Sequence, residues 1–263
     1  MFIFFACSHC IAQRDTAYRF IKAIRADAVS LTVDNLDNLY ILTSSDQLKK
    51  FNENGDSVAV YNDVKRFGKL HSIEVSNPLK LLLYYKDFST IVILDRLLAS
   101  RGSIDLRKLN ILQTSAVGIS YDNNIWLFDE YNNRLKKINE EGNTLMETSD
   151  FRMLFGQSVL PQQIIDKDGL VYLYDVNNGL FVFDHYGTFK RKIPVTKWKN
   201  ISITDKLIYG LHDQWLQSYN TSTLMQHKHS LPETSGSFLN YIIVNTKLFA
   251  VAKDSVNIYT YKF

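Results

Sequence analysis

The chain repeats, six times over, a stretch whose first copy is Leu48-Lys49-Lys50-Phe51-Asn52. Each copy has Leu or Ile, two variable positions, an apolar residue, and then Asn or Asp, except that the sixth ends in Lys. The other copies are Ile91-Val92-Ile93-Leu94-Asp95, Leu135-Lys136-Lys137-Ile138-Asn139, Leu180-Phe181-Val182-Phe183-Asp184, Leu216-Gln217-Ser218-Tyr219-Asn220 and Ile258-Tyr259-Thr260-Tyr261-Lys262. Their first residues are 43, 44, 45, 36 and 42 positions apart. A period of about 42 residues with short alternating apolar segments is typical of a four-stranded β-propeller blade.

Each copy has similar neighbours, which supports the repeat. Turn-forming residues precede an apolar segment upstream, as Asp122-Asn123-Asn124 precedes Ile125-Trp126-Leu127-Phe128. Downstream, Asn52-Glu53-Asn54-Gly55 and Asp184-His185-Tyr186-Gly187 are typical of hairpin loops. Asn, Asp and Gly tolerate the left-handed backbone that tight turns require. We therefore expect the repeat to be the third of four strands in each blade, counted outward from the axis.

Six repeats predict an all-β, six-bladed propeller whose last blade lacks a fourth strand, because the sequence ends after the sixth copy. The first complete inner strand is expected at Ala28–Val33, which leaves the alternating segment Tyr18–Ile24 unassigned. We expect this segment to pair with Val256–Tyr261 and complete blade six, because an open seam would leave unpaired strand edges.

The sequence predicts one domain, residues 14–263, preceded by an export signal at residues 1–13. The chain has 263 residues, 4 Pro and no low-complexity linker, and ring-shaped β folds reach this length as single domains. The longest stretch without strand alternation runs from Thr148 to Gln163, and it predicts a short helix or an ordered loop between blades three and four. Such insertions often carry contacts with partners.

The first 13 residues are apolar and precede the first charge, Arg14. They resemble a secretory signal without its usual basic start, and the alternative is a buried first strand. The motif Cys7-Ser8-His9-Cys10 leaves three interpretations open. The thiols are lost with the signal, Cys7 is a lipid anchor, or the motif binds metal or acts in redox chemistry, although no second cysteine pair is available.

Residues that could carry catalysis or bind metal have simpler interpretations. Asp34, Asp122, Asp166 and Asp205 occupy repeated turn positions, where capping of the turn is favoured over calcium binding or acid–base chemistry. The pair His227 and His229 is expected to be exposed on an outer strand rather than to bind metal. No phosphate loop or nucleophile elbow is present in the sequence. We therefore predict a protein that is not an enzyme, with no catalytic residue, cofactor or metal site.

Basic residues gather in three runs, Lys49-Lys50, Lys136-Lys137 and Lys190-Arg191-Lys192. The net charge of +3 and the isoelectric point near 8.6 are too small an excess to indicate a nucleic-acid partner. We interpret the three runs as solvated lysines that protect strand edges.

An interaction surface would need exposed apolar residues near the connections between strands. Five residues are candidates for an interface, and the alternative for each is a core residue that anchors a loop. They are Phe151, Leu154, Phe155, Trp198 and Trp215.

Three longer segments resemble a Bacteroidota family of small exported propellers, the Plug-type proteins of the type IX secretion translocon. The segments are Val75–Phe88, Ser120–Asp129 and Asn178–Asp184, and the resemblance extends from about Ala28 to Phe263. Parts of them are also shared with NHL and WD-repeat propellers. The resemblance implies a periplasmic protein, associated with the outer membrane, that caps the inner mouth of an outer-membrane barrel as a monomer within a hetero-complex. It implies no catalytic residue.

Two hypotheses follow. The first is a non-catalytic interaction propeller that plugs the secretion barrel, with no nucleic-acid partner and no transmembrane segment of its own. The second is a calcium-dependent hydrolase or lactonase, or a sugar-binding protein, that uses turn carboxylates. An apolar patch on one rim favours the first, and acidic side chains that converge in a concave pocket favour the second.

Overall fold

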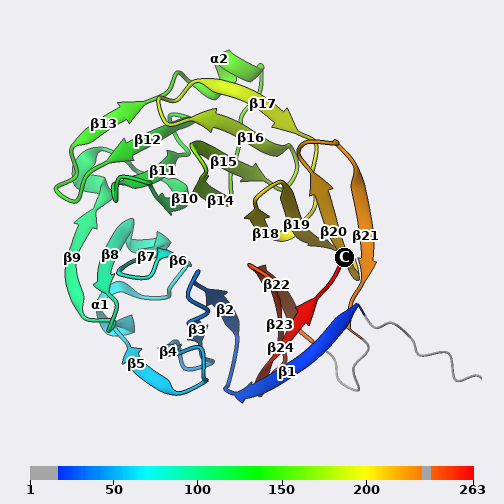
Figure 1. Ribbon diagram of the computed structural model, residues 1–263. Helices are drawn as coiled ribbons and strands as arrows, with labels where there is room; N and C mark the ends of the chain where they lie inside the picture. The colour runs from blue at the N-terminus through cyan, green and yellow to red at the C-terminus, as the bar shows by residue number, and fades with distance from the viewer. Residues whose placement is uncertain (1–16, 233–237) are drawn as a thin grey trace, which may run out of the picture.

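Six four-stranded antiparallel sheets are arranged in a ring, as the sequence predicted (Figure 1). The computed structural model describes residues 17–232 and 238–263. The first strand of each blade lies nearest the axis. Blade 1 contains β2 (Ser30–Val33), β3 (Leu39–Leu42), β4 (Leu48–Phe51) and β5 (Ser57–Tyr61); blade 2 contains β6 (Ser72–Asn77), β7 (Lys80–Tyr85), β8 (Thr90–Asp95) and β9 (Ser100–Asp105); blade 3 contains β10 (Thr114–Ile119), β11 (Ile125–Asp129), β12 (Arg134–Ile138) and β13 (Thr144–Glu147).

The remaining blades follow the same plan. Blade 4 contains β14 (Gln163–Lys167), β15 (Leu170–Asp175), β16 (Gly179–Asp184) and β17 (Phe189–Ile193); blade 5 contains β18 (Lys199–Thr204), β19 (Leu207–His212), β20 (Trp215–Asn220) and β21 (Gln226–Ser230); blade 6 contains β22 (Asn240–Val244), β23 (Lys247–Val251), β24 (Ser255–Tyr261) and β1 (Tyr18–Arg25). Short helices interrupt the connections at α1 (Val64–Phe67), η1 (Lys86–Phe88), η2 (Leu106–Leu109) and α2 (Phe151–Phe155).

Blade 6 is closed by the N-terminal strand. β1 pairs antiparallel with β24, so that Tyr18 lies opposite Tyr261 and Ile24 lies opposite Val256. This confirms the predicted closure. The predicted boundary of the first inner strand was wrong by two residues, because β2 begins at Ser30. The backbone N–H of Ala28 instead donates to the carbonyl of Lys253 in blade 6, at 3.3 Å.

The Asn or Asp that ends each repeat starts the turn to the fourth strand. The side-chain oxygen of Asp95 accepts hydrogen bonds from the backbone N–H groups of Leu97 and Ala99, both at 2.9 Å. Asn52, Asn139, Asp184 and Asn220 make corresponding bonds in their own blades. The sixth copy has Lys262 because blade 6 needs no such turn. The N–H of Lys262 donates to the carbonyl of Ala17, which leads into β1.

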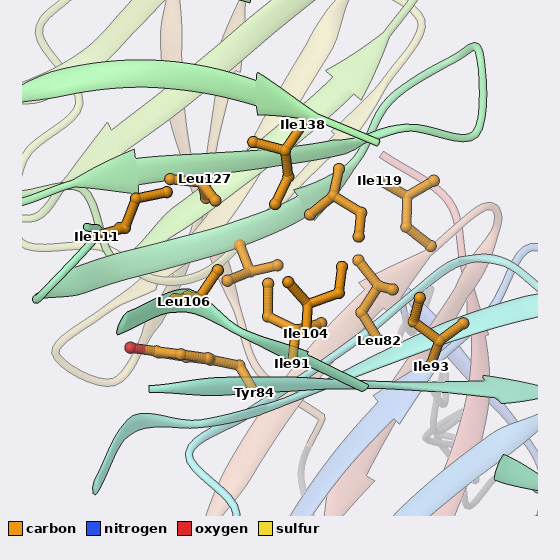
Figure 2. Close-up of a cluster of buried hydrophobic side chains, with 12 residues drawn as sticks. Leu82, Tyr84, Ile91, Ile93, Ile104, Leu106, Ile111, Ile119, Leu127 and Ile138 are labelled. Atoms are coloured by element: carbon orange, nitrogen blue, oxygen red, sulfur yellow. The ribbon is translucent and has the colours of Figure 1, made fainter. Parts of the chain in front are cut away.

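The core lies between neighbouring blades. Figure 2 shows side chains of blade 2, such as Leu82 and Ile91, pointing toward those of blade 3, such as Leu127 and Ile138. Each is 0–1% exposed, and full burial of such a side chain contributes about 1.5–3 kcal/mol. Tyr84 also donates its hydroxyl proton to the carbonyl of Thr114, at 3.1 Å. Each blade therefore depends on its neighbours for stability.

The ring has two rims with different connections. We call rim A the rim with the turns between first and second strands and between third and fourth strands. Rim B carries the turns between second and third strands and the connections from one blade to the next. All four short helices lie on rim B, because each occupies a connection of one of these two kinds.

Candidate functional site

The longest connection on rim B runs from blade 3 to blade 4 and contains α2. Asn133, which is buried, holds it in place: its amide donates to the carbonyl of Val159 at 2.8 Å and accepts from the N–H of Val159 at 3.1 Å. Asp150 caps the first turn of α2 by accepting from the N–H of Arg152 at 2.9 Å. Gly156 ends the helix with a left-handed φ of 69°. The sequence predicted either a short helix or an ordered loop, and the connection contains both: the short helix α2 lies within an ordered loop.

An aromatic cluster fastens α2 to the blades beneath it. Phe151 stacks on Phe183 with ring centroids 5.1 Å apart, and it meets Phe128 edge-on at 5.2 Å. Phe155 lies farther out, with its centroid 4.9 Å from that of Phe189 on the outer strand of blade 4. Phe151 is fully buried and Phe155 is partly buried. These rings make α2 a rigid platform.

α2 and the segments beside it expose apolar side chains next to the charged pair of Arg152 and Asp150. Met153 is 85% exposed and Leu154 is 47% exposed, and Leu160 on the same connection is 43% exposed. Tyr131 belongs to the neighbouring turn, which Arg152 joins by donating to the carbonyl of Asn132 at 3.4 Å. We call Tyr131, Met153, Leu154 and Leu160 the apolar rim patch. α2 lies at the outer circumference of the ring between blades 3 and 4 (Figure 1).

The five predicted interface residues do not form one surface. Phe151 and Trp198 are core residues, which is the alternative interpretation, and neither is available to a partner in this structure. Trp198 packs between blades 4 and 5. Its ring lies so close to Gly210 that a Cβ atom added to this glycine would be only 2.8 Å from the ring. Leu154 and Trp215 are exposed, but Trp215 lies on the rim B turn of blade 5. A contact of Leu154, Phe155 or Trp215 with a partner stays a prediction.

The axis of the ring is a channel with a volume of about 680 Å³, lined by apolar and polar residues from the inner strands of all six blades. Glu74 on β6 lies in it, and its carboxylate accepts a hydrogen bond from the N–H of Ser76 at 2.7 Å. Burial raises the pKa of the Glu74 carboxyl, although hydrogen bonds from Ser76 and Val75 oppose the shift. A smaller cavity of about 310 Å³ continues from the channel at rim A, lined by Asn35, Asn77 and Tyr121 among others.

Asp166 joins blades 3 and 4 at rim A, which the sequence did not reveal. Its carboxylate accepts from Trp126 Nε1 at 2.8 Å and from the N–H of Tyr121 at 3.2 Å, and it lies 2.9 Å from His185 Nε2. His185 stacks on Tyr121 with centroids 3.9 Å apart. The Asp166 side chain is only 2% exposed, so its oxygens are occupied by protein groups. Because Tyr121 and Trp126 lie about one blade away in sequence and His185 lies 19 positions away, no local pattern could indicate these partners.

The other turn carboxylates have separate roles. Asp34 caps its own turn by accepting from the N–H groups of Leu36 and Asn38, both at 2.9 Å, as predicted. Asp122 pairs with Lys137 at 2.9 Å; burial acts against ionisation, but this hydrogen bond and others lower the pKa of Asp122 to about 2. Within residues 17–232 and 238–263, no three His, Cys, Asp or Glu side chains gather in a way that would hold a metal ion. Cys7 and Cys10 lie outside that part of the chain.

Two lysines of the basic runs are buried, which corrects their interpretation as solvated edge residues. Lys50 donates to the carbonyl of Arg96 in blade 2 at 2.8 Å, and its ammonium lies 5.1 Å from the ring centroid of Tyr40. Burial lowers the pKa of Lys50. Lys137 lies over the rings of Tyr121 and Trp126. Both belong to third strands, in the interior of their sheets: Lys50 reaches blade 2, whereas Lys137 pairs with Asp122 of its own blade. Lys190–Lys192 on the outer strand β17 are exposed.

The two histidines on the outer strand β21 differ in burial: His227 is exposed and His229 is partly buried. His229 lies 2.9 Å from Ser218 Oγ and stacks on Phe263. Burial lowers the pKa of His229. The two rings are 6.5 Å apart, so each has its own environment.

Comparisons with known proteins confirm the fold. No protein-family model and no curated protein sequence matches this chain significantly. Among solved structures, virginiamycin B lyase from Staphylococcus aureus is similar with a TM-score of 0.65 at 12% identity, over 93% of this chain and 100% of that chain. BamB from Moraxella catarrhalis is similar with a TM-score of 0.56 at 12% identity, over 93% of this chain and 98% of that chain. The Cps50 (Swd1) propeller domain from Myceliophteria thermophila is similar with a TM-score of 0.62 at 8% identity, over 93% of this chain and 100% of that chain. These likenesses include an enzyme and interaction modules, and at such identities they show the propeller fold alone. No helix among residues 17–232 and 238–263 is long and apolar enough to cross a bilayer.

Proposed function

We propose that this protein is a non-catalytic interaction propeller in the periplasm that plugs the inner mouth of a type IX secretion barrel in the outer membrane. The observation that carries the proposal is the apolar rim patch. Exposed large apolar side chains that gather beside polar ones mark protein interaction sites. The resemblance of the sequence to Plug-type propellers supplies the identity of the partner.

The patch has the features of a binding surface prepared in advance. The exposed side chains of Met153 and Leu154 stand on a helix whose first residue, Phe151, is locked into the core. Asn133 fixes the loop that follows. A surface that is ordered before binding loses less conformational entropy when a partner arrives. Arg152 and Tyr131 add the residue types that most often dominate binding energies at interfaces.

The patch is the centre of the proposed interface rather than its whole area. A stable protein interface buries about 1,200–2,000 Å² in total, which is more than four side chains supply. Neighbouring groups on rim B, including Asn132, Gln157 and Asn178, would then form the polar border. Gln157 donates to Asn178 at 2.9 Å, so that the border is also ordered.

The test is a double substitution, Met153→Asp with Leu154→Asp, in a tagged copy expressed in the native host. We expect the variant to fold but to lose co-purification with the outer-membrane barrel, and the outer membrane to leak large antibiotics. The matched control is Leu224→Asp with Met225→Asp, a Leu–Met pair on rim A with exposures of 66% and 59%. The control should capture the barrel normally. Equal capture by both variants, or normal impermeability after deletion of the gene, would remove the plug proposal.

A ligand-binding or hydrolytic function is the second candidate, and the axial channel, with the Glu74 carboxylate in its lining, is the observation that favours it. A concave site with a few polar groups is the usual form of a small-molecule site. Calcium-dependent hydrolysis of a lactone or phosphoester by the purified protein would support this candidate. Loss of that activity on replacement of Asp122 or Asp166 by Asn would assign it to the turn carboxylates.

A further inference from the structure

The two rims differ in charge. On the turns of rim A acidic residues outnumber basic ones: the acids are Asp34, Asp37, Glu53, Asp56, Asp122, Glu140, Glu141, Asp168 and Asp205, and the bases are Arg96, Lys206 and Lys262. On rim B, basic residues concentrate where blades 1, 2 and 3 meet. These are Lys65, Arg66, Lys69, Lys86, Arg107 and Lys108, all exposed, and we call them the basic sector. The acids within the same connections are Asp63 and Asp87.

The three connections that supply the basic sector touch one another. Phe88 packs against Gly68 of the connection from blade 1 to blade 2. A Cβ atom added to Gly68 would lie only 3.1 Å from the ring of Phe88. The connection from blade 2 to blade 3 is joined to the same turn, because Leu106 N–H donates to the carbonyl of Ser89 at 2.9 Å. Ser89 Oγ also donates to the carbonyl of Leu112, at 3.4 Å. The six bases therefore occupy one continuous area of rim B.

Most of these charges are uncompensated. Among residues 17–232 and 238–263, Arg107 alone of the six forms an ion pair, with Asp105 at 3.1 Å. Arg66 lies over the ring of Phe67, at 4.7 Å from its centroid. The ammonium groups of Lys65, Lys69, Lys86 and Lys108 face solvent. An area of this kind attracts anionic surfaces.

Two apolar side chains stand within the basic sector. Phe88 is 42% exposed and Leu112 is 57% exposed. These two residues and the six bases line neither the axial channel nor the cavity at its rim A mouth. Bases that surround projecting apolar side chains are typical of surfaces that lie on a membrane.

We propose that the basic sector binds anionic phospholipid headgroups at a bilayer surface, with Phe88 and Leu112 entering the headgroup layer. A planar bilayer suits this area better than an acidic peptide, because the charges spread over three connections and surround two projecting apolar side chains. Lysines as strongly hydrated point charges on flexible stems suit delocalised attraction rather than fixed pairing. The proposal does not depend on which protein the apolar rim patch contacts.

The experiment is co-sedimentation of the purified protein with vesicles of phosphatidylcholine, with or without 30% phosphatidylglycerol. We expect binding only to the anionic vesicles, and loss of that binding on raising salt from about 0.05 to 0.5 M, because the Debye length shrinks. The variant carries Lys65→Glu, Lys69→Glu and Lys108→Glu. Each basic residue near the surface contributes about 5-fold in affinity, so binding should fall more than 100-fold.

The control reverses three exposed bases on outer strands, Arg19→Glu, Arg191→Glu and Lys228→Glu, which gives the same net charge. It should bind like the wild type. A second variant, Phe88→Trp, should show a blue shift in fluorescence with anionic vesicles, and the shift should be absent with Tyr186→Trp on rim A. The proposal is overturned if wild-type protein does not bind anionic vesicles, if it binds neutral ones equally, or if both triple variants lose binding alike.

Discussion

Rim A carries short turns that resemble one another from blade to blade, whereas rim B carries connections that differ in length, structure and charge. On rim A the side chain of Asn or Asp closes the turn in five blades, and Gly55, Gly142 and Gly187 take the left-handed backbone that such turns need. On rim B each connection has its own fastening, such as Asn133 beneath α2. The difference indicates that rim A maintains the repeat, and that rim B is where this protein acquired individual surfaces.

The strongest test of this comparison is at blade 6, where pairing with β1 replaces the turn found elsewhere on rim A. Deletion of residues 17–24 should lower the free energy of unfolding by several kcal/mol, because β24 loses its partner and the seam opens. Urea unfolding followed by circular dichroism measures the change. An unchanged midpoint would mean that the ring does not need its closing strand.

On rim B, the buried and exposed residues of α2 should behave in opposite ways. Phe151→Ala should cost about 3–5 kcal/mol, because it leaves a cavity among the packed rings. Met153→Ala, on the exposed face of the same helix, should change stability by less than about 0.5 kcal/mol. Thermal unfolding of both variants measures the two stability changes. A large loss at Phe151 and a small one at Met153 would show that Phe151 anchors the helix and that Met153 belongs to the exposed surface. Similar losses for the two would show that the patch belongs to the core.

On rim A, substitutions of Asp184 test whether the turn needs a charged side chain or only an oxygen that accepts hydrogen bonds. Asp184→Ala should cost about 1 kcal/mol, since the N–H groups of Tyr186 and Thr188 lose their acceptor. Asp184→Asn should cost less, because Asn52, Asn139 and Asn220 start the corresponding turns in other blades. An Asn variant as unstable as the Ala variant would contradict this account of the repeat.

The same residue gives a pH dependence with a definite sign. Hydrogen bonds from Lys190 and from the backbone of Thr188 lower the pKa of Asp184 to about 2. A carboxyl with a lowered pKa in the folded state stabilises above its unfolded pKa of about 3.9, and that contribution is lost as the pH falls through 2. The stability difference between wild type and Asp184→Asn should therefore shrink between about pH 4 and pH 2. Because Asp184 is partly exposed, water screens the effect and it should be small.

The smallest expected change lies between the rims, at Glu74 in the channel. Its pKa is raised by burial, so the folded protein favours the protonated carboxyl. Stability should fall as the pH rises above the unfolded pKa of about 4.3, and it should level off above the folded pKa. Glu74→Gln should be the more stable protein at pH 8, with the advantage absent at pH 4. An advantage that did not vary with pH would point to packing instead.

Sequence reasoning predicted what a blade repeats and missed what joins one blade to the next. The third strands, their turns and the pairing of β1 with β24 follow from local alternation and from the need to leave no edge unpaired. The contact of buried Lys50 with Arg96 of blade 2, and the bridge from Asp166 to Trp126, join residues about one repeat apart. Short-range periodicity contains no information on such contacts. The apolar rim patch was predicted only in part: Leu154 was named and the stretch from Thr148 to Gln163 was expected to carry contacts, but Tyr131 on the neighbouring turn was not named.

The pairing of β1 with β24 also sets the timing of folding. Of the 24 strands in the ring β1 is synthesised before the others and its partner β24 after them, so the closing ladder cannot form while the other blades are being synthesised. Domains that fold through such long-range contacts fold slowly, and the delay exposes them to aggregation. Until then Phe20 and Ile21, which remain 54% and 42% exposed in the finished ring, lie on an unpaired strand. A nascent chain of this protein is therefore expected to need a chaperone until its last strand is complete.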